Sequence, residues 1–163
     1  MSAFAFPLVY PPFTRAVNTG SSPEAKELEQ RFKEVVFHFR RRVERERAFS
    51  ELARAIDTGR EEDWDRYGGI PVDRQVAQLA CRFLNALPSA VPTPEVGLDP
   101  DGEISFDWIV SRDRQLTVSL SPDGLLSYAG IFGATSIAHG TEGFDDTVPQ
   151  AIVEAIRRLG VKA

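Results

Sequence analysis

The sequence is poor in the residues on which several kinds of chemistry depend. Cys81 is the only cysteine, so neither an intramolecular disulfide nor a cysteine-based metal cluster can form. Lysine occurs only at positions 26, 33 and 162, which leaves the middle of the chain without a Schiff-base or phosphate-loop lysine. The two histidines, His38 and His139, show no metal-ligand spacing. We therefore predict no cofactor, no metal ion and no catalytic residue.

Motifs of catalysis and of membrane insertion are also missing. The sequence has no glycine-rich phosphate loop and no G-x-S-x-G nucleophile elbow. Residues 1–13 are apolar but lack a basic stretch and are broken by three prolines, so we expect no signal peptide. No run approaches the roughly 18 apolar residues of a membrane span. Together with the single thiol, these features predict a cytoplasmic protein without membrane contact.

Charge is present in abundance but is unevenly distributed. Residues 1–60 carry 11 Lys and Arg against 8 Asp and Glu, a balance of +3. Residues 61–163 carry 8 against 16, a balance of −8. The acidic part should repel nucleic acid, whereas the basic part can attract an acidic surface.

The first third of the chain predicts an arm and a helix. Residues 1–22 are rich in proline and read as an extended arm, and residues 23–58 read as one long helix or two shorter ones. Ser22 is the expected N-cap and Pro23 the first helical residue. Apolar residues then recur at helical spacing: Leu28, Phe32, Val35, Val36, Phe39 and Val43. The pattern weakens in residues 40–47, where the helix is either continuous or broken.

Residues 59–163 predict the body of a single α+β domain. A helix is expected at 72–87, and the related segments DPDGEISF and SPDGLLSY each predict a hairpin turn that leads into a strand. Alternation places Ile104, Phe106, Trp108 and Val110 on one apolar face. A further strand is expected near 134–139, and Thr147 with Gln150 predicts a capping box for a final helix. The fold class is an antiparallel β-meander of four to five strands, covered on one face by helices.

The segments DWDRYGGIPV, FLNALP, PDGEISFDW and SYAGIFG follow one another in this body. In this order they resemble a family of short bacterial proteins that carry a Trp-Asp-x-Tyr-Gly motif ahead of a small antiparallel sheet. The resemblance covers roughly residues 50–160 and implies the same architecture and a bacterial origin, but no known activity. Relatives often have glycine where this chain has Arg66, so the turn is expected to be less permissive here.

Trp64 and Tyr67 lie among acids just before two glycines and a proline. We interpret this stretch as a corner, in which both rings pack between helices and the glycines allow a tight turn. The alternative is a ligand platform, because an aromatic pair beside acids can hold a cationic group.

Two enzymatic alternatives remain open. His139 precedes Glu142, Asp145 and Asp146, and a histidine held by a carboxylate can serve as a general base for a hydrolase or nuclease. A metal-dependent nuclease could instead use four acids on the first hairpin: Asp99, Asp101, Glu103 and Asp107. A calcium loop is not expected, because the final acid that such a loop needs falls on Trp108.

The sequence therefore favours a non-enzymatic protein-interaction or regulatory module, such as an inhibitor, an antitoxin-like or immunity-like protein, or a mobile-element accessory protein. Its expected partner is another protein or a second copy, bound through the arm or the long helix. The expected contact residues are the arm aromatics and the helix arginines: Phe4, Phe6, Tyr10, Phe13, Arg40, Arg41, Arg42, Arg45 and Arg47. Nucleic-acid binding by the same arginines is a second alternative.

Overall fold

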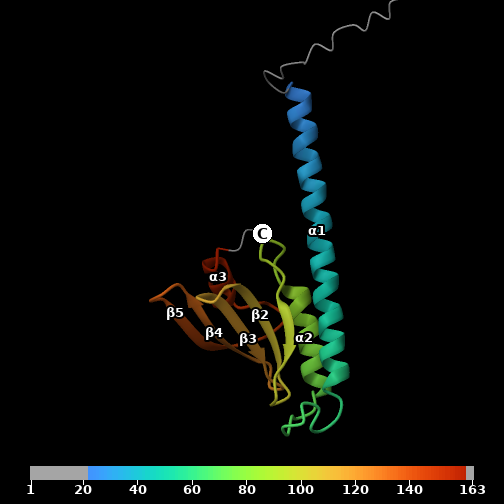
Figure 1. Ribbon diagram of the computed structural model, residues 1–163, viewed down its shortest axis with the longest axis vertical. Coiled ribbons are helices and arrows are strands. Elements are labelled where there is room, and N and C mark those ends of the chain that lie inside the picture. The colour runs from blue at the N-terminus through green and yellow to red at the C-terminus, as the bar shows by residue number, and fades with distance from the viewer. Residues whose placement is uncertain (1–21, 161–163) are drawn as a thin grey trace, which may run out of the picture. The chain divides into compact units, whose positions relative to one another are not determined.

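A computed structural model describes residues 22–160 of the chain (Figure 1). The chain divides into two compact units, Met1–Phe37 and His38–Ala163. The elements, in chain order, are α1 (Pro23–Thr58), α2 (Arg74–Ala86), β1 (Glu95–Leu98), β2 (Ile104–Ser111), β3 (Arg114–Leu120), β4 (Leu125–Phe132), β5 (Ile137–Gly143) and α3 (Gln150–Arg158).

Helix α1 is a single helix with no break in residues 40–47. It begins as predicted, because the Ser22 hydroxyl accepts a hydrogen bond from the backbone N–H of Ala25 at 3.2 Å. Glutamate–arginine pairs four residues apart continue through the arginine-rich segment, for example Arg42 with Glu46. Pairs at this spacing support a helix, which explains why the weaker apolar pattern there does not interrupt it.

The five strands form one antiparallel sheet in which every strand pairs with its sequence neighbour, in the order β1-β2-β3-β4-β5. Gly102 and Gly124 end the two Pro-Asp-Gly turns with φ of +83° and +75°, values that favour glycine. The two sequence-related segments are thus confirmed as hairpin turns. The last strand lies later than predicted, at Ile137–Gly143.

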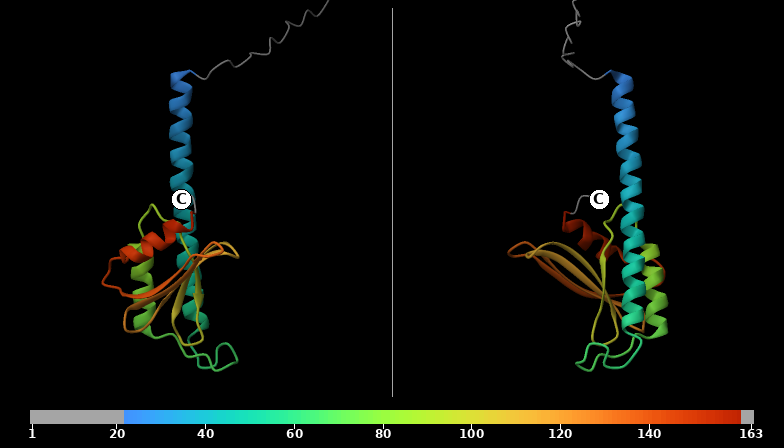
Figure 2. Two further views of the ribbon diagram at one scale, coloured as in Figure 1. Left: turned by 90° about the vertical axis from the view of Figure 1, so that its left-hand side faces the viewer. Right: turned by 45° about the vertical axis from the view of Figure 1, so that its right-hand side comes forward.

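One face of the sheet carries the core, and α2 and α3 lie together on that side (Figure 2). Phe83 of α2 is fully buried, with its ring 4.5 Å from that of Phe106 and 5.6 Å from that of Phe144. Burial of such apolar side chains is the main favourable term in folding. The predicted fold class, an antiparallel meander with helices on one face, is confirmed.

The second unit begins within α1, well before residue 59, where the sequence places the start of the body. Ala48 and Leu52 of α1 are buried in the core, and α1 runs beside α2 in Figures 1 and 2. The Glu51 carboxylate accepts a hydrogen bond of 3.1 Å from the backbone N–H of Val96. Residues 38–58 are therefore an integral part of the body.

Some local predictions are wrong, each for an identifiable reason. Val110 is exposed rather than buried, because the β2–β3 register shifts between Ile109 and Ser111 and interrupts the alternation. Thr147 forms no capping box, because α3 begins at Gln150 with Pro149 at the N-cap position and no side-chain cap. Helix α2 begins at Arg74 rather than at Val72, because Asp73 is its N-cap and accepts a hydrogen bond from the Gln75 N–H at 2.6 Å.

Candidate interaction surface

Large apolar side chains are exposed along the first part of α1. In the first unit, Leu28, Phe32 and Val35 are 70%, 68% and 66% exposed, and Val36 is 47% exposed. We call these four residues the apolar stripe. In the second unit, Phe39 and Val43 continue the same sequence spacing and are also exposed. Exposed apolar residues that occur singly are ordinary, but a run of them at helical spacing marks an interaction surface.

The side chains around the stripe stabilise the helix without covering the stripe. Arg31 pairs with Glu27 at 2.8 Å and Lys33 pairs with Glu29 at 2.7 Å, each one turn apart. The hydrogen bond and charge of Lys33 lower the pKa of Glu29 below its usual range. Exposed pairs of this kind contribute little to stability, so they maintain the helix but do not remove the cost of apolar exposure.

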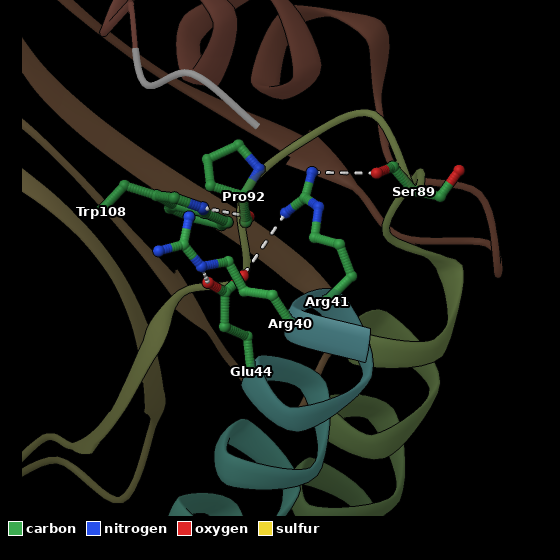
Figure 3. A network of polar contacts seen from close by, with 6 residues as sticks. All are labelled: Arg40, Arg41, Glu44, Ser89, Pro92 and Trp108. Carbon is green, nitrogen blue, oxygen red and sulfur yellow. Dashed lines mark hydrogen bonds and ion pairs between the residues drawn. The ribbon is translucent and has the colours of Figure 1, made fainter. Parts of the chain in front are cut away.

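The five predicted contact arginines do not form one exposed row. Arg41, whose side chain is 14% exposed, donates a hydrogen bond of 2.9 Å to the Ser89 carbonyl (Figure 3). Arg45 donates to the carbonyls of Leu84 and Asn85 at 2.9 and 2.8 Å. These carbonyls belong to the last turn of α2, where a cation is favourable. Two of the arginines therefore attach α1 to α2 and to the segment that follows α2.

Arg40, Arg42 and Arg47 point outward, with side chains 70–79% exposed. Each has a glutamate one turn later, and the Arg47–Glu51 pair, at 2.7 Å, raises the pKa of Arg47. Glu44 lies between Arg40 and Arg41 (Figure 3). Its carboxylate oxygens are 3.9 Å from the nearest guanidinium nitrogen of each arginine. The outward positive charge is thus largely balanced by neighbouring acids.

A shallow hollow of about 230 Å³ lies between α1 and the segment that follows α2. Arg41, Arg42 and Arg45 form one side, and Leu84, Leu87 and Val91 contribute apolar surface. The nearby Trp108 indole donates to the Pro92 carbonyl at 2.8 Å and so fixes the same segment against the sheet (Figure 3). Two of its lining side chains, Arg41 and Arg45, are already engaged in attaching α1 to α2 and to the segment that follows it.

The Trp64–Tyr67 stretch is a corner held by its own polar groups. The Asp65 carboxylate accepts hydrogen bonds from the N–H groups of Tyr67 and Gly69 at 2.8 and 2.9 Å. The Trp64 indole donates to the Ile70 carbonyl at 3.1 Å, and a Cβ at Gly69 would lie 2.6 Å from the indole nitrogen. Tyr67, however, is 93% exposed, so our expectation that both rings pack between helices is wrong for this ring.

His139 lies on the open face of β5, the edge strand, and its side chain is exposed. In the strand register it shares a row with Ala129, Thr117 and Asp107, which places Asp107 three strands, or about 14 Å, away. Of the acids near it in sequence, Glu142 projects from the opposite face of β5, and Asp146 pairs with Arg82. Among residues 22–160, no ion pair joins this histidine to a carboxylate.

Two of the four hairpin acids accept hydrogen bonds from hydroxyl groups of β3. Asp99 accepts a hydrogen bond from the Ser119 hydroxyl at 2.9 Å, and Asp107 accepts one from the Thr117 hydroxyl at 2.5 Å. Burial, with smaller contributions from Asp101 and Asp99, raises the pKa of Glu103. Within residues 22–160, no group of three or more His, Cys, Asp or Glu is arranged to hold a metal ion.

The apolar repeat of α1 is visible in the sequence, but its residues are not among the predicted contact residues. The missing signal is the spacing of Leu28, Phe32, Val35 and Phe39, which is four, three and four residues. That spacing places the four side chains on one face of a helix, as a surface that packs against a partner requires. The arm aromatics Phe4, Phe6, Tyr10 and Phe13 lie outside the described residues.

Among the described helices, none combines the length and the apolar character needed to cross a membrane. Comparison with known proteins gives no similarity: no family model, no curated protein and no solved structure matches this chain. The resemblance to short bacterial proteins stays a prediction.

Proposed function

We propose that this protein is an interaction module that acts by burying the apolar stripe of α1 against a protein partner, and that it does so in the cytoplasm. The observation that carries the proposal is the exposure of Leu28, Phe32 and Val35, each about two-thirds or more. Complete burial of one such side chain is worth about 1.5–3 kcal/mol, so covering several of them supplies a substantial driving force for binding.

The arginines contribute less to the proposed interface than the sequence predicts. Arg40, Arg42 and Arg47 can add polar contacts around an apolar centre, as charged residues commonly do at the rim of an interface. Because each has a neighbouring glutamate, they give a mixed rather than a strongly basic surface. A mixed surface favours a protein partner over nucleic acid, whose binding depends on unbalanced positive charge.

The test is site-specific photo-crosslinking in cells that express the chain. A photoreactive phenylalanine analogue replaces Val35 in one variant and Gln30, an exposed residue on the opposite side of the helix, in the control. We expect a protein adduct from position 35 and none from position 30. Absence of an adduct at position 35, or equal labelling from both positions, would contradict the proposal.

A further inference from the structure

We infer that the partner of the apolar stripe is a second copy of this chain, packed antiparallel along α1. This inference rests on the proposed function and adds the identity of the partner. The spacing of Leu28, Phe32, Val35 and Phe39 is that of the two core positions of a heptad repeat. In such a repeat each core residue packs into a hole formed by four residues of the facing helix, so a helix with this seam is suited to pair with another like it.

Side-chain size favours the antiparallel orientation. In a parallel pair, like residues meet in one layer, so Phe32 would face Phe32 and Phe39 would face Phe39. In an antiparallel pair centred between Phe32 and Val35, each Phe32 faces a Val35 and each Leu28 faces a Phe39. Every layer then combines one phenyl ring with one aliphatic side chain, which fills the seam evenly.

Charge favours the same orientation. In this register residues 40–43 of one helix lie opposite residues 24–27 of the other. The first segment carries the exposed Arg40 and Arg42, and the second carries Glu24, Lys26 and Glu27, a balance of −1. A parallel pair would instead bring Glu24 of one copy near Glu29 of the other, twice by symmetry, and like charges at these flanking positions oppose association.

The first test is the mass of the full-length purified chain in sedimentation equilibrium over a range of concentrations. We expect a monomer–dimer equilibrium that Val35→Glu weakens by about 100-fold and that Gln30→Glu, the same residue introduced on the opposite side, leaves within about 2-fold. Both positions are exposed, so both variants should retain the thermal unfolding midpoint of the unmodified chain at a concentration at which that chain is monomeric. A chain that stays monomeric at every concentration would overturn the inference.

The second test determines orientation by disulfide formation in a Cys81→Ser background. Antiparallel packing places Ala25 opposite Arg42 of the other copy, and neither residue belongs to the apolar stripe. We expect a mixture of Ala25→Cys and Arg42→Cys proteins to form a mixed disulfide dimer under mild oxidation, with little disulfide from either protein alone. An Ala25→Cys protein that links efficiently to itself would indicate parallel packing and would overturn the inference.

The crosslinking experiment separates the failure of this inference from the failure of the proposed function. An adduct at position 35 with twice the mass of the chain supports both. An adduct with a different polypeptide, together with a monomeric purified chain, overturns the self-association and leaves the interaction module supported.

Discussion

The two parts of α1 belong to one helix, yet their apolar residues differ in how far they are buried. Leu52, in the second unit, is almost completely buried in the core, whereas Leu28, in the first unit, is 70% exposed. Both occur in helical sequence that is rich in charge. The difference shows that a helical apolar pattern predicts the need for a packing surface but not whether the same chain supplies that surface.

The largest expected contrast comes from shortening these two leucines. Leu52→Ala should lower the free energy of unfolding by about 2–5 kcal/mol, because it leaves a cavity in a filled core. Leu28→Ala should change it by no more than about 0.5 kcal/mol when the chain is dilute enough to be monomeric. Urea unfolding followed by circular dichroism measures both. Equal losses would show that the stripe contributes to the core of the folded monomer.

The attachment of α1 to α2 offers a second contrast, between two arginines three residues apart. Arg45→Gln should destabilise the fold by about 1.5 kcal/mol, because it removes charge-assisted hydrogen bonds to the carbonyls of Leu84 and Asn85. Arg42→Gln removes only an exposed pair with Glu46 and should cost about 0.3–0.5 kcal/mol. Chemical denaturation of the two variants side by side distinguishes them, and a larger loss for Arg42→Gln would refute the assignment of roles.

In the turn after α1, one substitution should increase the stability of the fold rather than decrease it, and by a smaller amount. Arg66 has a φ of +66°, in the left-handed region that disfavours most residues with a side chain. Relief of this strain exceeds the extra conformational entropy that glycine gives the unfolded chain, so Arg66→Gly should stabilise the fold by about 0.5–1 kcal/mol and raise the thermal midpoint. Arg60→Gly, just after α1 ends, is the control, because no such strain is relieved there. An unchanged or lower midpoint for Arg66→Gly would contradict the prediction.

The smallest expected change in stability concerns Glu103. Burial of its carboxyl group raises its pKa in the folded protein. A raised pKa means that the folded state holds this proton more tightly than the unfolded state, so the carboxylate costs stability at neutral pH. That cost is lost as the pH falls through the raised pKa toward 4.5, the ordinary pKa of a glutamate. Glu103→Gln should therefore stabilise the protein at pH 7, and its advantage should shrink on acidification.

Urea midpoints measured from pH 7 to pH 4 test this dependence. Glu62→Gln, which removes the same charge from an exposed loop, is the control. If the stabilisation by Glu103→Gln grew as the pH fell, the prediction of a raised pKa for Glu103 would be contradicted.

Much of the fold follows from local rules in the sequence. The Pro-Asp-Gly turns, the alternation of Ile104, Phe106 and Trp108, and the Ser22 cap are short-range signals, and each is confirmed. The exposure of Val110 depends on a register shift that alternation does not encode. The position of β5 is similarly set by its pairing with β4 rather than by its own weakly patterned sequence.

The candidate site was harder to predict, because exposure is a property of the whole fold. The repeat of Leu28, Phe32 and Val35 is plain in the sequence, but only the structure shows that these residues stay outside the core. The reverse holds for Arg41 and Arg45, which look like free charges in the sequence and prove to bind backbone carbonyls of residues more than 35 positions away. Long-range hydrogen bonds of this kind leave no local sequence signal.

The neighbour-to-neighbour order of the sheet also bears on how the protein is made. Each hairpin can close as soon as its second strand leaves the ribosome, without waiting for a distant partner. Helix α3, however, follows all five strands and contributes Ile152 and Ile156 to the buried interior. Until it emerges, the apolar side chains on which α3 packs stay exposed on the nascent chain, and exposed apolar surface of this kind is what chaperones bind.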